Sequence, residues 1–305
     1  MLFCIDRLQI IDNQLICFEF IDIDNQDNFK KGVNYPFLNK KIEILKKIFQ
    51  NNFYLVQYSY TQNMTWVKTS CFSKKYTFDQ FSDSFSTMNN LSNLNKDSSK
   101  KLGAVTESKG DPYIQSLLTS IYQETDYKNT NFIGDDNGIE LVQKSLREAS
   151  TYGFDFDLFE PTNNIIIEFL KRESPLVTNK TAHPNRYTGQ NYKKFLSLWE
   201  AAKLLNCTKP NLFLVNYSDD STEEITLIRI IDFEVSKDTP EKMINSDIGY
   251  LFQNKTTFIN WLSTLNTNPT SALSELDNLP KQIRDKNFWE YNAAIFKSNI
   301  GKEYV

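Results

Sequence analysis

Residues 153–173 read GFDFDLFEPTNNIIIEFLKRE, and this stretch decides which fold the chain is expected to adopt. Two short apolar runs flank a turn at Pro161–Asn164, which is the pattern of two strands joined as a hairpin. The first run carries Asp157, and the second leads into Glu168 with Lys171 three residues further on. A carboxylate on an apolar strand is costly to place without a partner, which solvent or a divalent cation could supply. Two acids and a lysine on neighbouring strands are what a metal-dependent phosphodiesterase requires.

The segments around this hairpin alternate between helical and strand patterns. Residues 137–152 carry an apolar face at helical spacing, and residues 191–206 form a strongly amphipathic helical pattern. Strands are expected at 211–218 and 225–233. The order helix, strand, strand, helix, strand, strand is typical of an α/β fold with a mixed sheet flanked by helices. The helix at 191–206 is long enough to make a right-handed crossover connection.

The N-terminal part predicts a smaller α+β domain over residues 1–80, with a role in recognition or oligomerisation. A hairpin is expected around Asp12–Gln14 and a helix over 39–50. Residues 81–110 are rich in Ser, Asn, Asp and Lys, a composition typical of a polar linker or mobile loop. Residues 111–305 then form the domain that contains the acidic hairpin.

The histidine and cysteine content disfavours several kinds of site. His183 is the single histidine, so chemistries that combine a histidine base with histidine ligands cannot be built here. No two cysteines form a CxxC pair and none lies near His183 in the sequence, so a structural zinc site is not expected. The four cysteines are Cys4, Cys17, Cys71 and Cys207.

Scattered single cysteines suit a reducing compartment, and a cytoplasmic location is therefore expected. No apolar run approaches the ~18 residues of a membrane span, and the N-terminus lacks the pattern of a signal peptide. The formal net charge of −4 argues only weakly against nucleic acid as a partner, because a local basic groove would not be visible in the total.

The hairpin and its flanking elements resemble the PD-(D/E)xK nuclease superfamily, which has the restriction-endonuclease-like fold. The resemblance covers roughly residues 135–233. It identifies Asp157 with the first acid of the family motif and Glu168 with the second, and Glu140 is the candidate for a further acid on the preceding helix. It implies a Mg²⁺-dependent endonuclease acting on DNA in restriction or anti-phage defence, with Mn²⁺ as a substitute metal. A homodimer or a partner defence protein would be expected.

The lysine departs from the family pattern, which is Glu-x-Lys. Lys171 lies three residues after Glu168, and strand side chains alternate, so the two are expected on opposite faces. Three explanations stay open: a β-bulge that brings Lys171 back, another cation such as Lys193 or Lys194 in its place, or a degenerate and inactive site.

In the active interpretation, Asp157 and Glu168 bind Mg²⁺, because this ion prefers carboxylate oxygens and retained waters. Asp155 shares a strand face with Asp157 and adds a ligand or an outer contact. Lys171 orients the attacking water and offsets charge in the transition state. Candidate phosphate contacts are Arg172, Arg186, Lys193 and Lys194.

The same residues also have explanations that involve no catalysis. Glu140 can pair with Lys144 at i+4 as an ordinary surface residue. The acids of the hairpin can be solvated residues without a metal. The alternative function is a catalytically inactive nuclease fold that binds nucleic acid, or an interaction subunit of a defence complex.

Overall fold

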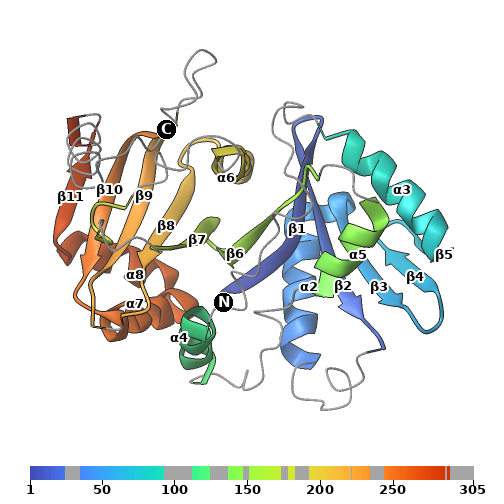
Figure 1. Cartoon of the computed structure of the whole chain (residues 1–305), viewed down its shortest axis with the longest axis horizontal. Coiled ribbons are helices and arrows are strands. Elements are labelled where there is room, and N and C mark those ends of the chain that lie inside the picture. The colour runs from blue at the N-terminus through green and yellow to red at the C-terminus, as the bar shows by residue number, and fades with distance from the viewer. Residues whose placement is uncertain are drawn as a thin grey trace, which may run out of the picture. The chain divides into compact units, whose positions relative to one another are not determined.

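The computed structural model describes residues 1–24, 35–92, 112–123, 137–146, 151–172, 178–182, 192–220, 222–233, 244–285 and 287–288. The chain forms two compact units, an N-terminal unit of Phe3–Asp157 and a C-terminal unit of Leu158–Val305 with Met1–Leu2. Each unit combines strands and helices (Figure 1). No helix within these ranges is both long enough and apolar enough to span a membrane. The division falls inside strand β6 (Phe154–Glu160), not between residues 81 and 110.

The N-terminal unit is built on a mixed sheet in the strand order β1-β2-β3-β4-β5. Its strands are β1 (Phe3–Ile11), β2 (Gln14–Asp22), β3 (Phe53–Ser59), β4 (Met64–Lys68) and β5 (Ser73–Thr77). Asp12 and Asn13 both have positive φ, of 50° and 60°, so they form the tight turn of the expected β1–β2 hairpin. The parallel pair β2–β3 is connected through α2 (Tyr35–Phe49), and the other pairs are antiparallel.

Alternating side chains of β2 serve the two faces of this sheet. Phe18 and Phe20 belong to the hydrophobic core that includes buried residues of α3 (Phe78–Asn90) and α5 (Asn137–Leu146). Glu19 points to the opposite face, where Lys41 of α2 approaches its carboxylate to 2.5 Å. Both partners of that ion pair are almost completely buried. The sheet is therefore covered on one face by α2 and on the other by α3 and α5 (Figure 1).

At residues 81–90 the expected linker is instead the greater part of helix α3. The side chain of Thr77 accepts the backbone N–H of Gln80, and the Gln80 side chain accepts the N–H of Thr77, which together make a capping box. Phe81 and Phe85, one helical turn apart, are buried in the core. Burial of these two aromatic side chains thus stabilises a helix in a stretch of polar composition. Residues 93–111, the rest of the expected linker, lie outside the described residues.

Replacing Asn89 by alanine is expected to lower the free energy of unfolding by roughly 2–4 kcal/mol. The buried Oδ1 of Asn89 accepts hydrogen bonds from Arg7 Nη2 (3.0 Å), Gln9 Nε2 (3.2 Å) and the Tyr152 backbone N–H (3.1 Å). Alanine removes this shared acceptor. Urea denaturation measures the loss, with the exposed neighbour Asn90→Ala as the matched control, expected to change stability by less than about 0.5 kcal/mol. Equal losses in the two variants would contradict this role of Asn89.

The strands of the C-terminal unit lie in the order β11-β10-β9-β8-β7-β6 and include parallel and antiparallel pairs. Leu158–Glu160 of β6 pair with β7 (Ile165–Lys171), and β7 runs parallel to β8 (Asn211–Tyr217). The antiparallel strands β9 (Ile225–Phe233), β10 (Ile244–Phe252) and β11 (Lys281–Arg284) complete the sheet. The α/β class with a mixed sheet flanked by helices is confirmed, as are the strands expected at 211–218 and 225–233.

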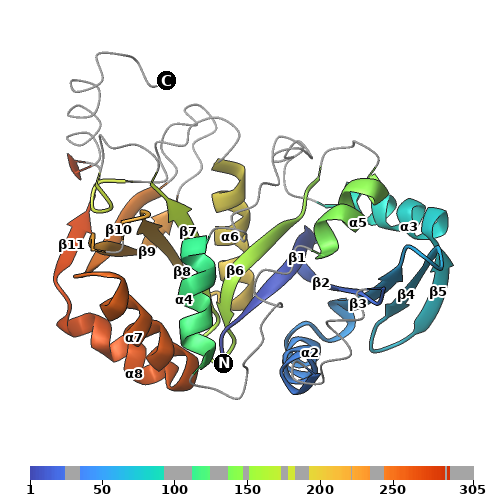
Figure 2. The ribbon, with the colours of Figure 1, turned by 60° about the horizontal axis from the view of Figure 1, so that its bottom comes forward.

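Helices cover both faces of the strands in the C-terminal unit. Helix α6 (Tyr192–Leu205) connects the parallel strands β7 and β8 and packs against both. Helices α7 (Lys255–Thr267) and α8 (Pro269–Glu275) lie side by side (Figure 2). Phe252 of β10 packs on Phe258 and Trp261 of α7, with ring centroids 5.1 and 5.6 Å away. The remaining described elements are α4 (Pro112–Gln123) and the 3₁₀ turns η1 (Gln50–Asn52) and η6 (Leu276–Asn278).

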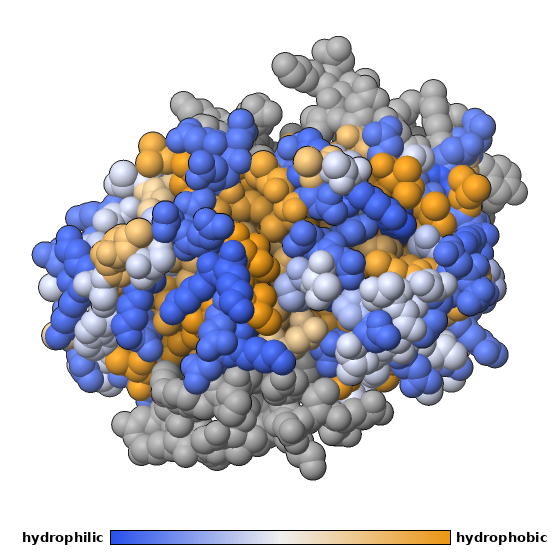
Figure 3. All heavy atoms as spheres, turned by 180° about the vertical axis from the view of Figure 1, so that it is seen from behind, coloured by the Kyte–Doolittle hydropathy of each residue, from blue (hydrophilic) through white to orange (hydrophobic). Residues whose placement is uncertain are grey.

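Large exposed hydrophobic side chains are spread over separate elements. On the face drawn in Figure 3, hydrophilic residues interrupt the hydrophobic ones. Within the described ranges, the large hydrophobic residues that are exposed are Phe72, Leu91, Leu204, Ile231 and Ile283. Single exposed apolar residues are normal for a folded surface, so none of them by itself marks an interface.

Candidate functional site

Strand β7 settles how Glu168 and Lys171 lie relative to each other. Its pairing with β8 runs without interruption from Ile165 opposite Asn211 to Lys171 opposite Tyr217. A β-bulge, which would turn Lys171 back toward the face of Glu168, is not present in this register. Regular alternation therefore places the two side chains on opposite faces, and the structure does not bring them together.

Lys171 has a different partner at the end of the strand. Its Nζ lies 2.8 Å from Oδ1 of Asp219, which follows β8. Both side chains are substantially exposed, so this pair contributes little to stability. Lys171 thus lies at the solvent-exposed end of β7, away from the carboxylate it was expected to assist.

Glu168 is instead ion-paired with Lys194, one of the two alternative cations on the following helix. The Lys194 Nζ contacts Oε1 of Glu168, and the two side chains are only 18% and 4% exposed. Glu168 lies in the middle of β7, and Lys194 lies in the first turn of α6. The β7–α6–β8 connection therefore brings an acid and a lysine together inside the C-terminal unit.

The position of Lys194 in its helix is unfavourable without this partner. The first turn of a helix carries partial positive charge from unpaired backbone N–H groups, so a lysine there is repelled. Burial adds a desolvation cost for both charges, which their mutual attraction must offset. Glu168 therefore holds Lys194 in place, and Lys194 equally holds the carboxylate, because either charge alone would be costly to bury.

Asp157 and Asp155 lie in β6, before the point at which the strand enters the C-terminal unit. Asp157 is buried, and Asp155, two residues earlier on the same strand face, is half-buried. The carboxylate of Asp155 acts electrostatically on the buried Arg7 of β1: burial lowers the pKa of the guanidinium, and Asp155 opposes that shift. Asp155 thus has a charge partner within the N-terminal unit.

The other predicted site residues occupy varied positions. Glu140 is exposed, and its carboxylate lies 2.5 Å from Lys144 Nζ, which is the i+4 pair that the sequence also predicted. Arg172 contacts the Glu223 carboxylate, and its Nε donates to Oδ1 of Asn179 at 3.3 Å. Its charge is therefore already met by a carboxylate. Arg186 and the side chain of Lys193 lie outside the described residues.

A second buried ion pair lies on the Glu168 face of the sheet, and it was not predicted from the sequence. Asp247 of β10 and Arg284 of β11 are cross-strand partners, with Nε 2.5 Å from Oδ1, and neither side chain is exposed. Burial lowers the pKa of Arg284 and the charge of Asp247 opposes this, while Nη1 of Arg284 donates to the Lys180 carbonyl at 3.1 Å. A polar residue inside each strand was the only available signal.

The donor groups of the candidate site fit one kind of metal. Three or more histidine, cysteine, aspartate or glutamate side chains do not converge anywhere in the part of the chain that the structure describes. Mg²⁺ is commonly bound through one or two carboxylates, with water and substrate phosphate completing its six ligands. Glu168 would supply one such carboxylate.

Comparisons with known proteins did not identify a relative of this chain. No family model matches the chain, and no curated protein or solved structure matches it either. The resemblance to the PD-(D/E)xK superfamily therefore stays a prediction from residues 135–233, and function has to be inferred from the site itself.

Proposed function

We propose that this protein is a Mg²⁺-dependent phosphodiesterase that hydrolyses nucleic acid, with DNA as the expected substrate. One observation carries the proposal: a buried glutamate on a central strand is paired with a lysine on the crossover helix. Phosphodiester hydrolysis requires an anionic group to hold a metal and a cationic group to offset charge on the phosphate. Glu168 and Lys194 are an anionic and a cationic group of these two kinds, placed side by side.

Asp157 enters the proposal through its position in the sequence of the hairpin. It directly precedes Leu158, which pairs with Ile167, and Ile167 directly precedes Glu168. The resemblance gives Asp157 the part of the first acid of the motif, and this part stays a prediction. A Mg²⁺ held by Glu168 would polarise the phosphate and lower the pKa of a bound water.

Lys194 takes the role that the resemblance gave to Lys171. In the resting protein its ammonium group neutralises Glu168. With the charge of Glu168 met by a bound metal, Lys194 would direct its three N–H donors toward a phosphate oxygen and the attacking water. Water then forms the new P–O bond, the bond to the leaving oxygen breaks, and the proton released from water ends on the leaving group or in solvent.

A second candidate is a nucleic-acid-binding or protein-interaction subunit without catalysis. It is favoured by the burial of Glu168: the carboxylate is 4% exposed and is already paired with the ammonium group of Lys194. Buried ion pairs of this kind also occur as purely structural features. This candidate predicts nucleic-acid binding that does not depend on divalent metal, and no cleavage products.

The test is a cleavage assay on supercoiled plasmid, linear duplex DNA, single-stranded DNA and RNA, each with Mg²⁺, Mn²⁺ or EDTA. The proposal expects products with metal and none with EDTA. Cleavage that persists in EDTA would overturn the metal-dependent mechanism. Metal-independent binding without any products would favour the second candidate.

A further inference from the structure

The C-terminal unit holds a polar pocket of about 460 Å³ on the sheet face opposite to Glu168. Arg229 of β9 pairs in register with Phe213 of β8, which pairs with Ile167 of β7, so these three share one face. Glu168, the next residue of β7, points to the other face. The pocket is therefore separate from the site proposed above, and its volume suits a small-molecule ligand.

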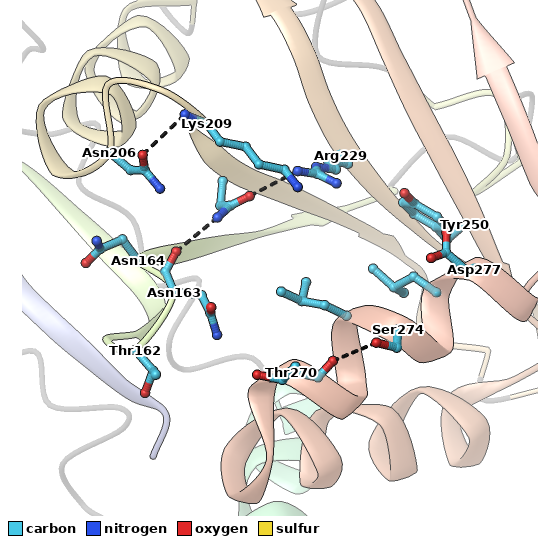
Figure 4. Close-up of a pocket in the computed structure, with 13 residues that line it drawn as sticks. Thr162, Asn163, Asn164, Asn206, Lys209, Arg229, Tyr250, Thr270, Ser274 and Asp277 are labelled. Atoms are coloured by element: carbon cyan, nitrogen blue, oxygen red, sulfur yellow. Dashed lines mark hydrogen bonds between the residues drawn. The ribbon is translucent and has the colours of Figure 1, made fainter.

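Arg229 is held in this pocket by neutral groups. Its Nη2 donates to Oδ1 of Asn211 at 3.1 Å, and Nδ2 of Asn211 in turn donates to the Asn163 carbonyl at 2.9 Å (Figure 4). The Nε of Arg229 is buried and has no hydrogen-bond partner among the described residues. No carboxylate within those residues forms an ion pair with this guanidinium. The amides orient the positive charge without neutralising it.

A second cation joins Arg229 from the connection between α6 and β8. The Asn206 side chain accepts the backbone N–H of Lys209 at 3.2 Å and the Thr208 hydroxyl at 3.0 Å, which fixes this short turn. The Lys209 side chain extends toward Arg229 (Figure 4). Two like charges that converge on a pocket repel each other, and an anion bound between them would remove that cost.

The opposite wall offers hydroxyl and carboxylate groups from α8 and η6. Thr270, Ser274 and Asp277 line it. Asp277 is held 2.9 Å from Lys281, and this hydrogen bond and the charge of Lys281 lower the pKa of its carboxyl group, with smaller contributions from Arg229 and Lys209. A carboxylate that stays ionised repels a second anion but accepts hydrogen bonds from hydroxyl groups. The pocket is thus cationic at one side and hydroxyl-binding at the other.

We propose that this pocket binds a small phosphorylated sugar or nucleotide, with its phosphate between Lys209 and Arg229 and its sugar hydroxyls at Ser274 and Asp277. Arginine and lysine together recognise phosphate through charge-assisted hydrogen bonds. The hydroxyl-binding wall favours a ligand that carries a sugar beside the phosphate over inorganic phosphate alone.

Isothermal titration of the full chain with AMP, ribose 5-phosphate, inorganic phosphate and adenosine tests this proposal. AMP and ribose 5-phosphate are expected to bind more tightly than inorganic phosphate, and adenosine is expected not to bind. Lys209→Met should weaken AMP binding about 10-fold or more, because a charge-assisted contact is lost. Lys209 is exposed, so this variant is expected to fold. Lys203→Met is the matched control, since Lys203 pairs with Glu200 on α6 outside the pocket.

Arg229→Met serves as the second variant, with its thermal unfolding checked against the wild type. It should lose AMP binding while keeping a cooperative unfolding transition. Four outcomes would overturn the proposal: no probe binds, adenosine binds as well as AMP, Lys209→Met binds AMP like the wild type, or a 5′-phosphorylated oligonucleotide binds while AMP does not.

Discussion

Glu168→Gln is expected to lower the rate of metal-dependent cleavage on the order of 10³-fold, about 4 kcal/mol of transition-state stabilisation. Glutamine keeps the shape of the side chain but removes the charge that would hold the metal. Glu168 is the one acidic residue of β7, so no other carboxylate of this strand can take its place. Initial rates under saturating Mg²⁺ give the ratio. A variant that keeps more than about a tenth of the wild-type rate would contradict this role.

A pair of lysine variants sharpens the same prediction. Lys194→Met should lose cleavage to a similar degree, because its ammonium group is the one in contact with Glu168. Lys171→Met should stay within about twofold of the wild type, since Lys171 lies on the other face and pairs with the exposed Asp219. The reverse result, with Lys171 required and Lys194 dispensable, would show that the family pattern holds despite the strand register. Circular dichroism should confirm that each variant is folded.

Arg284→Met is expected to lower the free energy of unfolding by about 3–5 kcal/mol, because it leaves the carboxylate of Asp247 buried without its cation. Neither side chain of this pair is exposed, and Arg284 also donates to the Lys180 carbonyl. The result can be read from urea denaturation monitored by tryptophan fluorescence.

Lys281→Met, on the same strand, is the control for this effect. Lys281 pairs with the exposed Asp277, and exposed pairs contribute less than about 1 kcal/mol. The double variant Asp247→Leu/Arg284→Met should recover much of the lost stability, since replacing both charges by apolar groups removes the buried charge. If Arg284→Met were no more destabilising than Lys281→Met, the buried pair would not be a structural requirement.

Strands with apolar or alternating patterns were predictable, and strands with polar interruptions were not. The triple isoleucine of β7 and the run at 225–233 indicated strands directly. β10 contains Asn245, Ser246 and Asp247 within its length, and β11 is a four-residue edge strand, so neither carries a usable pattern. Helix α3 was obscured because its composition is polar and its two anchoring phenylalanines decide the structure only through tertiary packing.

The candidate site was also predictable only where a local sequence pattern determines it. Alternation along β7 already separated Glu168 from Lys171, and Lys194 was one of the two cations named to replace it. Local periodicity could not choose between Lys193 and Lys194, because that choice depends on how α6 packs against β7. The cross-strand pair of Asp247 and Arg284 joins residues far apart in sequence, and no local pattern reports such a partner.

The most direct test of the central claim is Mn²⁺ binding to the free protein, followed by electron paramagnetic resonance of unbound Mn²⁺, because this measurement needs no knowledge of the substrate. We expect the wild type to bind Mn²⁺, Glu168→Gln to bind it at least about 10-fold more weakly, and Lys171→Met to bind it like the wild type. Mn²⁺ binding that is unchanged in a folded Glu168→Gln variant, or absent from the wild type, would contradict the assignment of Glu168 as a metal ligand.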